Sequence, residues 1–104
     1  MDEKRQFFRI RNTGEIHAKA IDELEVIDIS SSGVLVIKKN SKVPPQGIIE
    51  LHILNFSINV SYEILRVEKK RMVLVFNKED EISKLFLVLK TLRDEQNKNT
   101  PPLA

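Results

Sequence analysis

A nine-residue stretch near the middle of the sequence alternates strictly between apolar and polar side chains. Its apolar residues are Phe56, Ile58, Val60, Tyr62 and Ile64, and one polar residue stands between each consecutive pair. Successive side chains of a β-strand point to opposite faces, whereas a helix would spread these residues around its axis. The stretch therefore predicts a strand with one face on a hydrophobic core and the other in water.

Other segments of strand length surround this one and predict a mainly β domain. Continuous apolar runs, as in residues 34–37 and 72–76, are typical of strands covered on both faces. The turns predicted at 30–33 and 68–71 favour antiparallel hairpins. The expected strands are 16–21, 24–29, 34–37, 49–53, 56–64 and 72–76.

The apolar spacing changes from strand-like to helical after Phe76. The residues that recur at helical spacing are Ile82, Leu85, Phe86, Leu89 and Leu92. Asn77 is a suitable N-cap, and the acidic residues 79–81 suit the positive end of a helix dipole. We expect one amphipathic helix that ends near Glu95, followed by a disordered polar tail over residues 96–104.

Composition narrows the class of protein. A chain of 104 residues has room for one small domain. The absence of cysteine excludes disulfides, thiolate metal sites and cysteine nucleophiles. The apolar runs are too short to span a bilayer, and the charged N-terminus lacks the apolar stretch of a signal peptide. We therefore expect a cytoplasmic protein without membrane insertion.

The sequence offers no constellation of residues for catalysis. The two histidines, His17 and His52, fall on different predicted strands, where both are expected to be exposed. Neither has a nearby nucleophile or a carboxylate cluster that would suit a metal. We therefore predict no enzyme, no metal and no cofactor, and a net charge of +2 is too small to indicate nucleic acid as the partner.

Two polar motifs point instead to ligand binding. Lys4, Arg5, Arg9 and Arg11 form a basic run before the first predicted strand. Such a run is most often a solvated arm. However, Arg5 and Arg9 are four residues apart and point the same way, and guanidinium groups suit both phosphate oxygens and the O6/N7 edge of guanine.

The second motif is the segment from Asp28 to Gly33. Asp28 and Ser30 project on one face at a strand end, and Gly33 allows close approach of the backbone. A carboxylate accepts hydrogen bonds from guanine N–H groups, while hydroxyls and amides suit phosphate. These residue types are also the ones that any tight turn prefers. Combined with the arginines, they indicate a site for an anionic guanine nucleotide.

RxxxR followed by DxSxxG, ahead of short strands and a C-terminal helix, resembles the PilZ domain, a bacterial receptor module for the second messenger cyclic di-GMP. The resemblance extends from Lys4 to about Glu95. It implies a six-stranded antiparallel β-barrel with a C-terminal α-helix over residues 13–95. It also implies that residues 1–12 form a mobile N-terminal arm, which carries RxxxR and becomes ordered around the ligand.

The resemblance also implies roles for individual residues. The expected cyclic di-GMP ligands are Arg5, Arg9, Asp28, Ser30 and Gly33, and possible additional contacts come from Lys4, Arg11, Ser31 and Ser32. A single-domain receptor has no output of its own, so a downstream protein partner is expected.

Two other functions remain open. One is a PilZ-like interaction module that binds a protein and no nucleotide. The other is a small barrel that binds single-stranded RNA through its basic arm and aromatic residues. Against RNA binding, Phe7 and Phe8 do not lie on a predicted strand platform.

Overall fold

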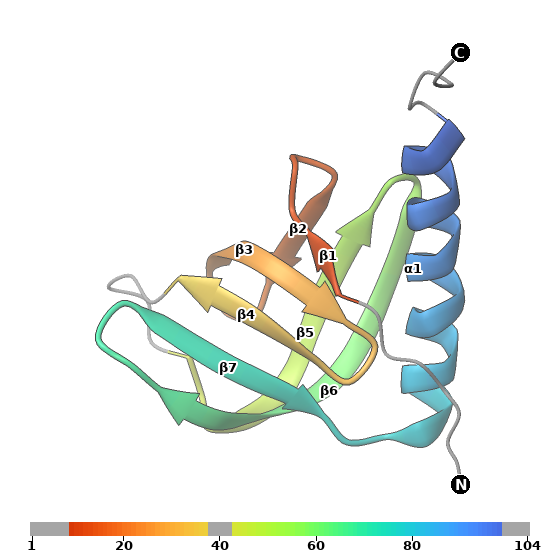
Figure 1. Cartoon of the computed structure of the whole chain (residues 1–104). Helices are drawn as coiled ribbons and strands as arrows, with labels where there is room; N and C mark the ends of the chain where they lie inside the picture. Colours follow the sequence, from red (N-terminus) through yellow and green to blue (C-terminus); the bar gives the residue numbers. More distant parts are fainter. Residues whose placement is uncertain (1–8, 38–42, 99–104) are drawn as a thin grey trace, which may run out of the picture.

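The computed structural model describes residues 9–37 and 43–98, which form seven strands and one helix (Figure 1). The strands are β1 (Ile10–Arg11), β2 (Ile16–Lys19), β3 (Glu23–Ser30), β4 (Gly33–Ile37), β5 (Gln46–Ile53), β6 (Phe56–Val67) and β7 (Arg71–Phe76), and the helix is α1 (Glu79–Lys98). All of the strand pairings are antiparallel. The mainly β architecture with a C-terminal helix is confirmed.

The sheet closes into a barrel. Its strands follow the order β3-β2-β5-β6-β7-β4, and β4 pairs back with β3. The short strand β1 pairs with the C-terminal part of β3, where Ile10 is opposite Ile29, while β2 pairs with its N-terminal part, where Ala18 is opposite Leu24. Because β1 and β2 follow each other along one edge of β3, they act as one interrupted strand. The expected six-stranded antiparallel barrel is therefore present.

Some boundaries differ from the sequence-based expectation. The segment expected as a 1–12 arm contains β1, because Ile10 is buried against the barrel and its strand pairs with β3. The first expected strand stops at Lys19, where the chain turns and the Ala20 amide donates to the carbonyl of Asp22 at 3.1 Å. The helix continues to Lys98, beyond the expected end near Glu95.

The core lies inside the barrel and beneath the helix. Val60 and Tyr62 of β6 are fully buried, whereas Phe56, at the start of the same alternating stretch, is 42% exposed. In β4 and β7 the inward side chains are buried, but outward ones such as Leu35 and Val73 are only partly buried. The prediction that β4 and β7 are covered on both faces is therefore correct only for their inner faces. The helix α1 does not cover their outer faces, because it packs against β5 and β6.

The helix is attached to the barrel by apolar and polar contacts. Its buried side chains are Ile82, Leu85, Leu89 and Leu92, as the helical spacing predicts. The Ile82 amide donates to the carbonyl of Lys78 at 2.8 Å, which places Lys78, not Asn77, at the cap position. Glu81 accepts a hydrogen bond from the Ser61 amide at 2.8 Å. This carboxylate therefore links the first turn of α1 to β6.

Tyr62 anchors the segment that enters β5. Its ring is buried, and its hydroxyl donates to the carbonyl of Pro44 at 2.9 Å. We expect Tyr62→Phe to lower the free energy of unfolding by about 1 kcal/mol, because the Pro44 carbonyl loses its donor. Urea unfolding of the two proteins at neutral pH measures the difference, and equal stabilities would contradict it.

Burial also raises the pKa of the Tyr62 phenol above its usual value of 10.0. The folded state then holds this proton more tightly than the unfolded state, so the associated stability is present below pH 10.0 and is lost as the pH rises further. Since Tyr62 is the only tyrosine, its phenolate absorbance reports this titration directly.

Candidate functional site

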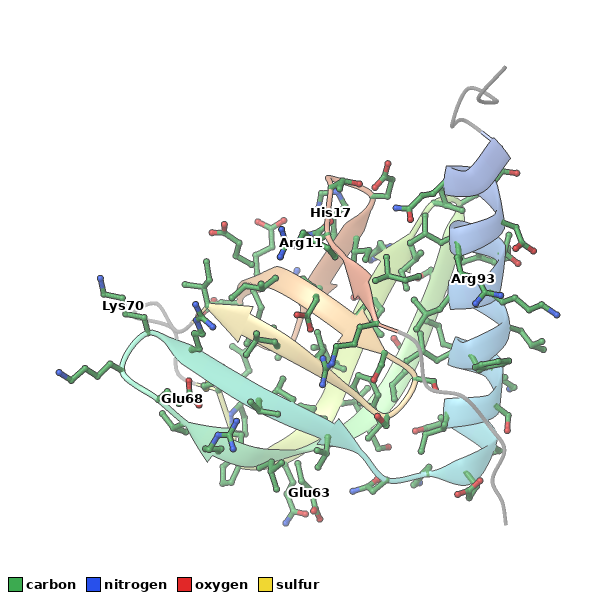
Figure 2. The ribbon with its side chains drawn as sticks, in the orientation of Figure 1. Arg11, His17, Glu63, Glu68, Lys70 and Arg93 are labelled. Carbon is green, nitrogen blue, oxygen red and sulfur yellow. The ribbon has the colours of Figure 1, made fainter. Side chains whose placement is uncertain are left out.

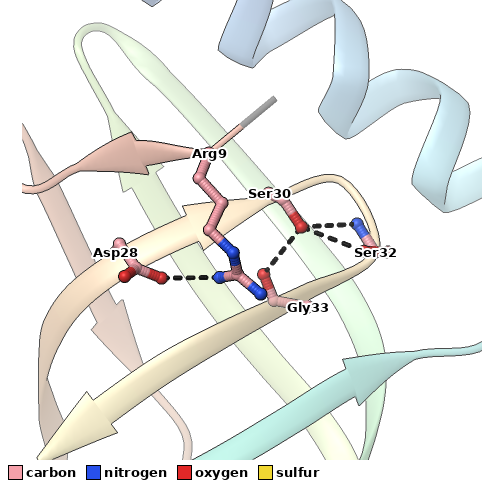
Figure 3. A network of polar contacts seen from close by, with 5 residues as sticks. All are labelled: Arg9, Asp28, Ser30, Ser32 and Gly33. Carbon is pink, nitrogen blue, oxygen red and sulfur yellow. Dashed lines mark hydrogen bonds and ion pairs between the residues drawn. The ribbon is translucent and has the colours of Figure 1, made fainter. Parts of the chain in front are cut away.

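Arg9 and Asp28 are 19 residues apart in the sequence and form an ion pair on the outside of the barrel (Figure 3). Nη1 of Arg9 lies 2.7 Å from Oδ1 of Asp28. The Arg9 side chain is 62% exposed and that of Asp28 is 24% exposed. Solvent screens a pair at such a site, so it adds only about 0–1 kcal/mol to stability. Both groups can therefore exchange partners at low cost.

The pairing of β1 with β3 brings a second cation close to this carboxylate. Ile10 is buried opposite Ile29, so the strand alternation puts Arg9 and Arg11 on the outer face. Arg11 is exposed and stands directly opposite Asp28 in the register. Asp28 thus forms an ion pair with Arg9, just before β1, and has Arg11 of β1 as its cross-strand neighbour.

The Asn12 side chain fixes the point where the chain leaves β1. Its Nδ2 donates to the carbonyls of Ile16 at 2.9 Å and Val26 at 3.0 Å. Its Oδ1 accepts from the amides of Gly14 at 2.9 Å and Ile16 at 3.2 Å. One side chain therefore ties β1, β2 and β3 together. This role of Asn12 was not predicted from the sequence, although Asn-Thr-Gly is a turn signal.

The turn between β3 and β4 is held by Ser30. This side chain is buried, and its Oγ accepts from the Ser32 amide at 3.2 Å. The same Oγ lies 3.0 Å from Oγ of Ser32 and donates to the Gly33 carbonyl at 3.5 Å. In this conformation the Ser30 hydroxyl shapes the turn, while Ser32 is on its exposed side.

Ser31 occupies a different environment from its neighbours. It is 1% exposed, and in the described part of the chain its Oγ is the one buried side-chain polar atom without a hydrogen-bond partner. Ser31 therefore does not contribute to the exposed surface that carries Arg9 and Asp28.

The close approach of β4 to β7 accounts for a glycine at position 33. A Cβ built at Gly33 would lie 2.6 Å from the carbonyl oxygen of Leu74 in β7. Gly33 is paired with Val75 and has no room for a side chain. This motif glycine therefore has a packing role that is separate from any contact with a ligand.

The structure brings together several of the residues expected at the site. Arg9, Arg11 and Asp28 meet on the outer face, and the turn from Ser30 to Gly33 continues from the same strand β3. Lys4 and Arg5 lie outside the described residues. The ion pair between Arg9 and Asp28 therefore joins the second arginine of RxxxR directly to the aspartate of DxSxxG.

A model of the PilZ-like family, described as PilZ domain-like, matches residues 9–97. The chain belongs to the PilZ domain-like family. Among curated proteins there is no match to this sequence. The matched residues of this PilZ domain-like chain include the barrel, the helix and Arg9, but not Arg5.

Solved structures show the same fold. An uncharacterised Legionella protein is 46% identical with a TM-score of 0.84, and the match covers 86% of this chain and 98% of that one. The PilZ domain of CeSA from a cellulose-synthesizing bacterium is 14% identical with a TM-score of 0.53, covering 80% and 98% of the two chains. The Bacillus subtilis inhibitor of motility (MotI/DgrA) is 16% identical with a TM-score of 0.56, covering 94% of this PilZ domain-like chain and 54% of the inhibitor.

Within the described residues of this PilZ domain-like chain, no helix is both long enough and apolar enough to cross a membrane.

Proposed function

We propose that this chain is a non-catalytic receptor for cyclic di-GMP that signals to a partner protein. The observation that carries the proposal is the 2.7 Å ion pair between Arg9 and Asp28. It joins the second arginine of the first motif to the first residue of the second motif. Membership of the PilZ domain-like family supports the same assignment.

The exposed pair suits recognition of a guanine nucleotide. A guanidinium group donates to guanine O6 and N7 or to phosphate oxygens, and a carboxylate accepts from the guanine N–H groups. In the structure Arg9 and Asp28 form an ion pair with each other. A bound guanine offers complementary partners to both, so the two groups exchange one charge-assisted contact for several.

Binding by Arg5 together with Arg9 would order the N-terminal arm over the barrel. The ordering costs conformational entropy, which the new charge-assisted hydrogen bonds offset. The rearranged arm would then create or hide a surface for a downstream partner. We place the receptor in the cytoplasm, where a nucleotide second messenger is made and read.

Calorimetric titration with cyclic di-GMP tests the proposal. The intact chain is expected to bind, and Arg5→Ala and Arg9→Ala are each expected to weaken binding by about 10-fold or more, because each removes a hydrogen bond from a charged group. The matched control is Lys70→Ala, which removes an exposed cation at the turn between β6 and β7 (Figure 2). This control is expected to bind like the intact chain.

The second candidate, an interaction module without a nucleotide, is favoured by one feature of the surface. A groove of about 540 Å³ runs between β6 and α1, and its walls include the exposed side chains of Phe56 and Leu87. A ligand that binds only the native state must raise the melting temperature. If cyclic di-GMP produces neither heat nor a rise in melting temperature, the receptor proposal is wrong and the interaction module takes its place.

A further inference from the structure

His17 and His52 are direct cross-strand partners on β2 and β5. Side chains at opposite positions of antiparallel strands have Cβ atoms about 4.5–5.5 Å apart. Their neighbours Ala18 and Leu51 are buried, so the alternation places both imidazoles on the outer face, where both are exposed. The position of His17 on this face is marked in Figure 2.

A carboxylate is already positioned beside one of the imidazoles. Nε2 of His52 lies 3.1 Å from Oε2 of Glu50. Two ligand atoms bound to one zinc ion, each at about 2.0–2.1 Å, lie about 2.9–3.4 Å apart for bond angles between about 90° and 110°. The two atoms thus have the separation of adjacent ligands on a metal ion.

We propose that His17, His52 and Glu50 bind one divalent transition-metal ion on the outer face of β2 and β5. Imidazole nitrogen suits zinc, nickel and copper, and a carboxylate oxygen is a common companion ligand. When Nε2 of neutral His52 takes the metal, its ring proton moves to Nδ1. The metal ion lies between Nε2 of His52 and the carboxylate of Glu50, and His17 adds the third ligand from the neighbouring strand.

The site requires one rearrangement. Across residues 9–37 and 43–98, no group of three or more His, Cys, Asp or Glu side chains is arranged to hold a metal ion as it stands. His17 is exposed, so its side chain can rotate toward His52 without disturbing the core. A hollow of about 430 Å³ borders both histidines and leaves room for coordinated water. Lys19 faces Glu50 in the register. Its positive charge repels the ion and lowers the affinity of the site for it.

The composition of the chain makes the test specific. It contains two histidines and no cysteine. In protein without an affinity tag, any site with two imidazole ligands from one chain must therefore use this pair. The measurement involves no nucleotide, so its outcome is independent of the proposed receptor function.

Calorimetric titration of the tag-free full chain with NiCl₂ and ZnCl₂ tests the proposal. We expect one ion per chain. His17→Gln and His52→Gln should each weaken binding by about 10²-fold or more, because the second ligand of a chelate binds at high effective concentration. Glu50→Gln should weaken it by about 10-fold. The control Ser57→Ala removes the hydroxyl of the residue opposite His52 on β6 and should bind like the parent.

Two outcomes would overturn the metal site. One is that the intact chain binds neither ion. The other is that either histidine variant binds as tightly as the intact chain. Both histidines are exposed, so matching melting curves without metal are expected for all variants and establish that lost binding does not come from unfolding.

Discussion

Replacing Asp28 by alanine is expected to lower the affinity for cyclic di-GMP by about 10- to 150-fold, which corresponds to the 1.5–3 kcal/mol of a hydrogen bond to a charged group. In the proposed complex this carboxylate accepts from guanine. In the structure one of its oxygens lies 2.7 Å from Nη1 of Arg9. Titration calorimetry measures the loss, and an affinity equal to that of the intact chain would contradict the assignment of Asp28 to the site.

A double-mutant cycle separates these two roles of Asp28. If Asp28 acts partly by positioning Arg9, then Asp28→Ala, Arg9→Ala and the double variant will be non-additive, with a coupling of about 0.5–3 kcal/mol. Asp28→Asn is the matched control, because it keeps the size and one acceptor oxygen while removing the charge. Full additivity would mean that the ion pair contributes nothing to binding and that each residue contacts the ligand independently.

Gly33→Ala is expected to destabilise the fold by about 1–3 kcal/mol or more, because the new Cβ would overlap the backbone of β7. The atom it meets, the Leu74 carbonyl oxygen, would lie at 2.6 Å, and Leu74 itself is fully buried. Neither strand can retreat without breaking the β4–β7 pairing. Thermal unfolding should show a fall of roughly 4–8 °C in Tm for each kcal/mol lost.

Gly47→Ala provides the matched control for this prediction. A Cβ at Gly47 would touch the ring of Tyr62 at 3.5 Å, which is ordinary van der Waals contact. We expect a stability within about 0.5 kcal/mol of the parent. If Gly33→Ala melts like Gly47→Ala, the approach of β4 to β7 is looser than the structure indicates.

Much of the barrel could be predicted from local pattern, because each strand has an inner and an outer face. The alternation through Val60 and Tyr62 identifies the inner face of β6 directly. In contrast, β1 is only two residues long, so it has no period to detect. It is held by its register with β3 and by the Asn12 side chain, both of which depend on partners distant in the sequence.

The contacts within the candidate site also could not be predicted from local sequence pattern. The motifs placed Arg9 and Asp28 in one site through the resemblance to the PilZ domain, but their contact depends on the register of β1 with β3. The pairing of His17 with His52 also depends on register, and no local pattern links the two positions. Ser31 was expected only as a possible additional contact to the ligand, and the turn buries it. Register and turn geometry are tertiary properties that residue type alone does not specify.

The Asn12 contacts have a consequence for the kinetics of the proposed nucleotide binding. They fix the start of β2 against the barrel, and the pairing of Ile10 with Ile29 fixes the position of the chain next to Arg9. Arg5 precedes Arg9 by four residues, and a fully extended chain of that length spans at most about 14 Å. An arginine confined to so small a volume has a local concentration in the millimolar range or above. In the proposed complex, capture by Arg5 of a nucleotide already docked at Arg9 and Asp28 is therefore an intramolecular step, and its rate is independent of the protein concentration.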